Sequence, residues 1–245
     1  MPAEPSIKRA FAFFDGQNLF HAARYAFGHR HPNFDPQRLA AAVCDARVWR
    51  LDRVHFYTGV PKRGDRPGWH DFWMRKLAAM GGRGVITRWR PLQMRVERVT
   101  LPNGEVAQLR VAQEKGIDVR IAVDVVRYAI EGLYDVGLIF SQDQDLGEVA
   151  TDIRAIAASQ GRWIKLASAY PEPPPGSHGR GIDRTDWIPF SKSRRPSPLE
   201  HAPRRSRDPR LNGHPPPRSA AAIAVAAARH AASSAAATSP DATPR

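Results

Sequence analysis

Cysteine is almost absent from this chain of 245 residues, since Cys44 is its only one. An intrachain disulfide and a zinc site built from cysteines are therefore both excluded. Cys44 lies in the apolar stretch LAAAVCDA. This surrounding predicts a small buried core residue.

Long hydrophobic runs are also missing. No apolar run approaches the roughly 20 residues that a membrane helix needs. The N-terminal stretch MPAEPSIKRAFAFFDG lacks the apolar core of a secretory signal. We therefore expect a cytoplasmic protein with no membrane partner. The oligomeric state stays open, and a homo-oligomer is compatible with the sequence.

Acidic residues are few compared with basic ones. The chain has 37 Lys and Arg against 24 Asp and Glu, a formal net charge of +13. Residues 191–245 hold ten of these basic residues and three acidic ones, so +7 lies there and +6 in residues 1–190. A basic chain of this kind favours a polyanionic partner, above all RNA or another nucleic acid.

Residues 191–245 are rich in Pro, Arg and Ala and include the low-complexity run SAAAIAVAAARHAASSAAATS. They contain too few large apolar residues to build a second core. The composition predicts one domain over residues 10–190, followed by a disordered basic tail over 191–245. The tail is either a polybasic RNA-binding arm or an extension without a role.

Short apolar strands alternate with amphipathic helices along residues 10–190. Strands are expected at 10–14, 53–60, 85–101, 106–111, 136–140 and 162–169, and helices at 19–27, 36–47, 67–80, 119–129 and 146–158. Asn103-Gly104 predicts a hairpin turn, and residues 182–190 are expected to pack back on the domain. This order predicts a three-layer α/β/α sandwich with a mainly parallel central sheet.

Two carboxylates follow the apolar run VGLIF at 136–140. The run is typical of a strand buried on both faces, and it changes abruptly into SQDQD, which contains Asp143 and Asp145. Carboxylates this close repel each other unless a cation or proton compensates them. Ligands bind at the carboxyl edge of such sheets, and oxygen ligands suit Mg²⁺ or Mn²⁺. The alternative is that one Asp only caps the following helix.

The first strand, AFAFF, delivers Asp15 to the same edge in the same way. Asn18 either caps the following helix or belongs to the site. Asp118 opens a mostly apolar helix, where a carboxylate needs a partner or a metal. Asp124 lies six residues on, about 240° round that helix, so Asp118 is the better ligand candidate. Lys115 is either a phosphate contact or a surface lysine.

Two further groups have structural and functional interpretations. Aromatic residues on the helix at 67–80 either fill the core or stack on RNA bases: Trp69, Phe72 and Trp73. Arginines of the expected hairpin either track phosphates or lie on a solvated sheet face: Arg88, Arg90, Arg95, Arg98 and Arg110.

Three stretches in this order, FFDGQNLF, EKGIDVRIAVDVV and GLIFSQDQDL, resemble the NYN domain, a branch of the PIN-like nuclease superfamily. The resemblance covers roughly residues 10–190. It implies a PIN-like α/β/α sandwich with an acidic, metal-dependent ribonuclease site. The family's acids match Asp15, Asp118, Asp143 and Asp145, and its polar positions match Asn18 and Ser141. The family pattern Ser-Gly-Asp-Ser-Asp-Phe is changed here, with Gln142 in place of Gly and Gln144 in place of a small hydroxyl residue.

The expected function is a metal-dependent endoribonuclease acting on single-stranded or structured RNA. The four carboxylates would hold one or two Mg²⁺ or Mn²⁺ ions, which activate water and stabilise charge on a phosphate. Asn18 and Ser141 would hydrogen-bond the scissile phosphate or a ligand carboxylate, and Lys115 would meet a phosphate.

The main alternative is a catalytically inactive PIN-like RNA-binding or regulatory protein, which the two glutamines favour. A small-molecule enzyme on the same fold is a second alternative. A Toprim or haloacid-dehalogenase-like phosphotransfer domain is a third, but the latter needs a DxD motif after the first strand, where this chain has Asp15-Gly16-Gln17. A dinucleotide-binding domain is disfavoured because no GxGxxG follows that strand.

Overall fold

The computed structural model describes residues 2–100 and 105–191. They belong to two compact units. The first unit contains the described residues 2–91 and 115–191, and the second contains 92–100 and 105–114. Apart from Ser191, the tail expected at 191–245 lies outside the described residues.

The first unit is built on a six-stranded sheet with the order β3-β2-β1-β6-β7-β8, and every neighbouring pair is parallel. Apolar runs such as AFAFF and VGLIF form its centre because both of their faces are buried. The strands are β1 (Lys8–Asp15), β2 (Trp49–Val60), β3 (Ile86–Pro91), β6 (Val136–Phe140), β7 (Lys165–Pro171) and β8 (Asp186–Phe190).

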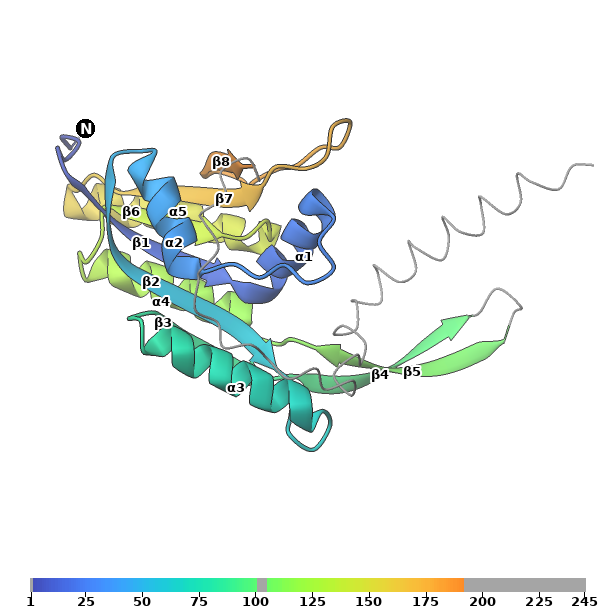
Figure 1. Cartoon of the computed structure of the whole chain (residues 1–245). Helices are drawn as coiled ribbons and strands as arrows, with labels where there is room; N and C mark the ends of the chain where they lie inside the picture. The colour runs from blue at the N-terminus through green and yellow to red at the C-terminus, as the bar shows by residue number, and fades with distance from the viewer. Residues whose placement is uncertain (1, 101–104, 192–245) are drawn as a thin grey trace, which may run out of the picture. The chain divides into compact units, whose positions relative to one another are not determined.

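Helices cover both faces of this sheet (Figure 1). Alternate residues of β1 point to opposite sides: Phe14 packs in the core with α1, α2 and α3, while Phe13 packs with α4 and α5. The sheet flanked by helices confirms the predicted α/β/α architecture. The helices are α1 (Gly16–Phe27), α2 (Pro36–Asp45), α3 (Pro67–Gly81), α4 (Ile117–Ile130) and α5 (Gly147–Gln160).

The strand order reverses between β1 and β6. The chain runs outward from β1 to β2 and β3, returns to place β6 beside β1, and then runs outward again to β7 and β8. The connecting helices change faces at the same point, as right-handed crossovers require. Such a switch point leaves a crevice at the carboxyl ends of the two central strands, where ligands of open α/β sheets bind.

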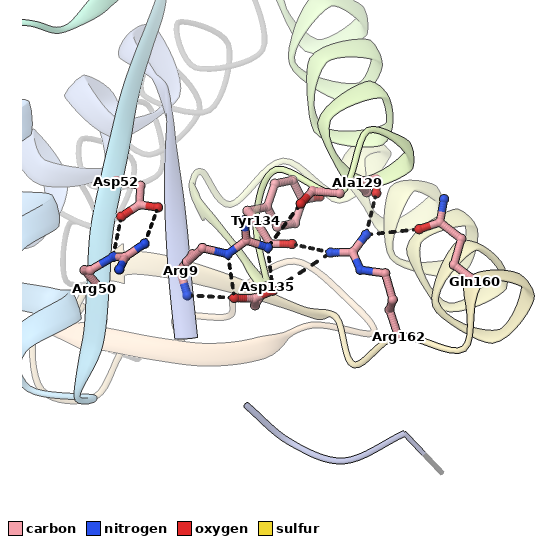
Figure 2. Close-up of polar contacts among 9 residues, drawn as sticks. Arg9, Arg50, Asp52, Ala129, Tyr134, Asp135, Gln160 and Arg162 are labelled. Carbon is pink, nitrogen blue, oxygen red and sulfur yellow. Dashed lines mark hydrogen bonds and ion pairs between the residues drawn. The ribbon is translucent and has the colours of Figure 1, made fainter. Parts of the chain in front are cut away.

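The amino edge of the sheet is held by an ion-pair network (Figure 2). Arg9 donates from Nε and Nη2 to the carboxylate of Asp135, at 3.1 and 3.0 Å. Arg162 donates to the carbonyls of Ala129 and Tyr134. Burial raises the pKa of Asp135, but the hydrogen bonds from Arg9 outweigh burial and hold it below its ordinary value. The network therefore joins the start of β1 to the turn before β6.

The second unit is an antiparallel hairpin of β4 (Gln93–Thr100) and β5 (Val106–Gln113), as predicted. Thr100 pairs with Val106, and the expected Asn103-Gly104 turn lies outside the described residues. The prediction of one strand over 85–101 was wrong, because the chain leaves the main sheet after Pro91 and begins β4 at Gln93.

This break changes which arginines lie on the hairpin. Arg88 and Arg90 belong to β3 of the main sheet, so the prediction that placed them on the hairpin was wrong. The three remaining arginines, Arg95, Arg98 and Arg110, are matched by Glu97, Glu105 and Glu114. Residues 92–114 therefore carry no net charge.

Cys44 is fully buried in the core, as predicted. The aromatic residues of α3 are half-buried, and Trp73 packs against the core. Residues 182–190 do pack on the domain and end in β8, which pairs with β7. Within the described ranges, no helix is long and apolar enough to cross a membrane.

Candidate active site

Asp15 ends β1 and begins α1 at the crevice beside β6. Its Oδ1 accepts the backbone N–H of Asn18 at 3.0 Å, so Asp15 caps the helix. The turn is tight because Gly16 follows at once: a Cβ there would lie 2.7 Å from the Phe56 ring and 2.8 Å from the Tyr57 carbonyl. The local sequence Asp-Gly thus fixes a carboxylate that is only 6% exposed at the strand end.

Ser141 links this carboxylate to the loop after β6. Its Oγ donates to Asp15 Oδ2 at 3.3 Å and accepts the backbone N–H of Asp143 at 3.1 Å. Asp143 Oδ1 accepts the N–H of Asp145 at 3.1 Å and caps the short helix η1 (Gln144–Leu146). Asp143 therefore caps η1 and not the longer helix α5, whose N-cap is Leu146. The charge of Asp143 acts on Asp15, so the two carboxylates lie near each other.

Asn18 forms the second link between the two loops. Its Oδ1 accepts the backbone N–H of Gln142 at 2.9 Å. The alternative in which Asn18 caps α1 was wrong, because Asp15 is three residues earlier in the chain and takes that position. Asn18 instead holds the loop after β6 against the start of α1.

Burial and charge act together on Asp15. Burial and, to a smaller extent, the neighbouring charge of Asp143 together raise its pKa to about 6, against hydrogen bonds from Asn18, Ser141 and Gln17 that lower it. The ionised form of Asp15 is thus costly, and a bound cation would offset that cost. A pair of carboxylates fits a hard divalent ion such as Mg²⁺, which binds proteins through one or two carboxylates.

The other predicted residues lie less close together. Asp118 is half-buried in the first turn of α4, and Asp145 and Lys115 are exposed. Among residues 2–100 and 105–191, no group of three or more His, Cys, Asp or Glu side chains is placed to hold a metal ion. The structure thus brings together Asp15 and Asp143, and the metal-binding roles of all four acids remain predictions.

Gln142 and Gln144, which depart from the family pattern, both form hydrogen bonds with a distant segment of the chain. Gln142 Nε2 donates to the Arg180 carbonyl at 2.9 Å, and Gln144 Nε2 donates to the Gly181 carbonyl at 3.0 Å. Gln144 Oε1 also accepts the N–H of Asp183 at 3.1 Å. The two glutamines therefore hold the loop after β6 against residues 180–183. In the sequence, the only signal of this contact is the presence of glutamine where the family pattern has Gly and a small hydroxyl residue.

The family model described as NYN domain matches residues 9–172. The chain belongs to the NYN domain family. The match spans β1 to the end of β7 and includes both central strand ends. NYN domains are PIN-like, so this membership supports a nuclease-like fold with RNA as the substrate class, and PIN-like nucleases generally depend on divalent metals.

No curated protein matches this NYN chain. A crystal structure of a protein of unknown function from Vibrio parahaemolyticus is similar at 17% identity, with a TM-score of 0.47, over 76% of this chain and 94% of that one. Acinetobacter baumannii MurG is similar at 11% identity, with a TM-score of 0.26, over 77% and 47%. Neither likeness supports an argument about function.

Proposed function

We propose that this NYN domain is a metal-dependent endoribonuclease whose site is the pair Asp15 and Asp143. The observation that supports the proposal most is their position: one buried carboxylate and its charged neighbour meet at the carboxyl ends of β1 and β6, where the strand order reverses. A crevice at this place is where an α/β sheet binds its ligand.

Each side chain has a role that its contacts support. Asp15 and Asp143 would hold Mg²⁺ or Mn²⁺, and a bound ion would supply an activated water and stabilise charge on the phosphate. Ser141 orients Asp15 through its Oγ, which agrees with the expected contact to a ligand carboxylate. The Nδ2 group of Asn18 would donate to the phosphate, since its Oδ1 is used by Gln142.

Three further residues complete the proposal. Asp118 and Asp145 would orient metal-bound waters from the start of α4 and from η1. Lys115, exposed just before α4, would contact a phosphate of the RNA.

The test is cleavage of an end-labelled single-stranded RNA with Mn²⁺, Mg²⁺ or EDTA. We expect cuts that require metal and are lost in Asp15→Asn and in Asp143→Asn. Asp152→Asn is the matched control, because Asp152 is an exposed acid of α5. Circular dichroism checks that all variants fold. Cleavage that persists in Asp143→Asn, or that survives EDTA, would contradict the proposal.

A second candidate is an inactive RNA-binding protein, which the replacement of two motif residues by Gln142 and Gln144 favours. The same experiment separates it: tight, salt-sensitive RNA binding without cleavage in any metal would select this candidate.

A further inference from the structure

Asp124, which the site does not use, lies fully buried on α4. Tyr57 donates to its Oδ2 at 2.9 Å, and Arg120 binds both oxygens, with Nε 3.1 Å from Oδ2 and Nη2 2.7 Å from Oδ1. A bidentate arginine and a hydroxyl group already provide charge compensation and hydrogen bonds for one carboxylate. Asp124 therefore needs no further cation.

Two more arginines nevertheless reach the same carboxylate. Arg127 Nη2 lies 3.3 Å from Oδ1, and Arg88 Nε lies 3.7 Å from Oδ2, too far for a hydrogen bond. The side chains of Arg88, Arg120 and Arg127 are 43%, 33% and 45% exposed. Each guanidinium group thus contacts the buried carboxylate of Asp124, and each side chain is also partly exposed to solvent.

The local charge is positive even when Asp124 and Glu131 are both counted. Arg127 also lies 3.9 Å from Glu131. Three arginines against Asp124 and Glu131 leave +1. Arg90 adds another positive charge close to the start of α4. Its Nη1 would lie 3.0 Å from a Cβ at Gly116, the residue that precedes this helix. We call these four residues the arginine strip: Arg88 and Arg90 on β3, Arg120 and Arg127 on α4.

The strand register relates the strip to the candidate site. Asp15 pairs with Tyr57, and Tyr57 pairs with Arg88. Paired residues of parallel strands point to the same face of the sheet. Neighbouring strands lie about 4.8 Å apart, and Arg88 is two strands away from Asp15, so their Cα atoms are roughly 10 Å apart. Arg90 continues the strip toward the carboxyl edge, beside the start of α4.

We propose that the arginine strip binds the phosphate backbone of the RNA that enters the Asp15–Asp143 site. This inference rests on the proposed function, and it assigns the substrate path to the border between β3 and α4. Planar, half-exposed guanidinium groups suit phosphate oxygens. The strip would bind RNA without reading its sequence, since it contacts phosphates only.

The test measures the binding of a fluorescently labelled single-stranded RNA in EDTA, over a range of salt concentrations, for Arg88→Gln and Arg90→Gln. Arg88→Gln leaves Tyr57 and Arg120 on Asp124, and Arg90→Gln does not touch the buried acid, so both should fold. The matched control is Arg38→Gln, because Arg38 is an exposed arginine of α2 on the opposite face of the sheet.

We expect a several-fold loss of affinity in each strip variant and no loss in Arg38→Gln. The slope of log K against log salt should become less steep by about 0.7 for each phosphate contact removed. Equal losses in all three variants, or none in the strip variants, would overturn the inference. The proposed function survives such an outcome if wild type cleaves RNA in a reaction that requires both metal and Asp143. If wild type neither binds nor cleaves RNA, both fail.

Discussion

Replacing Asp15 by Asn should stabilise the metal-free protein. The pKa of Asp15 is raised from 3.8 to about 6 by burial and by Asp143. At 1.36 kcal/mol per pKa unit, the ionised carboxylate costs about 3 kcal/mol of folding free energy. Asn carries no charge and caps helices about as well as Asp, so Asp15→Asn should recover most of this cost.

The sign of the pH dependence follows from linkage. Because the folded state holds the proton more tightly, the cost vanishes at pH values below 3.8 and is complete above about 6. The advantage of Asp15→Asn should therefore be about 3 kcal/mol at pH 8 and about half of that at pH 5. Other groups titrate in both proteins and cancel in the difference.

The assay is urea unfolding of both proteins in EDTA at pH 8 and pH 5. Asp152→Asn, a change of an exposed acid on α5, should stay within about 0.5 kcal/mol of wild type. Adding Mg²⁺ or Mn²⁺ should then stabilise wild type, by about 2.7 kcal/mol at 100 times the dissociation constant. Asp15→Asn should gain far less. An Asp15→Asn protein that is less stable than wild type in EDTA at pH 8, or whose advantage does not change with pH, would refute the reasoning.

Three further predictions concern stability, and urea unfolding measures each. Asp135→Asn should cost about 2 kcal/mol because it breaks the charged hydrogen bonds from Arg9. Asp52→Asn breaks only the exposed pair with Arg50 and should cost clearly less. Equal losses in the two variants would contradict this prediction. Gly16→Ala should cost about 1–3 kcal/mol, since its Cβ would meet the Tyr57 carbonyl at 2.8 Å; a neutral effect would show that the turn can relax. His55 is buried with its pKa lowered to about 4 by burial, so the free energy of unfolding should fall by roughly 3 kcal/mol as the pH drops from 6.5 to 4. His55→Phe should remove that dependence, and a slope unchanged in this variant would assign it to other groups.

The central part of the fold could be predicted because its signals are local. The apolar runs AFAFF and VGLIF are each typical of a strand buried on both faces. Asp15 follows the first run and SQDQD follows the second. These short stretches therefore predict two central strands and the acidic residues at their carboxyl ends. The helix period predicted that Asp124 does not share a site with Asp118. The partners of Asp124 could not be named, since Tyr57 and Arg88 come from strands whose register the sequence does not state.

The misplaced arginines have a similar cause. Arg88 and Arg90 alternate with other residues much as Arg95 and Arg98 do. The sequence pattern is therefore the same whether residues 85–101 form one strand or two. Only pairing decides between them: Arg88 pairs with Tyr57 in the main sheet, and Arg95 pairs with Val111 in the hairpin. The contact of Gln144 with Gly181 is also long-range, 37 residues apart in the chain.

The cap formed by Asp15 has one consequence for how the protein could be observed. The same carboxylate holds the first turn of α1 through the amide of Asn18 and would also hold the metal. An ion that draws electron density from Asp15 weakens this bond, so the amide hydrogen of Asn18 should exchange with solvent at a different rate in loaded and metal-free protein. The start of α1 would then report metal occupancy directly, without RNA and without turnover.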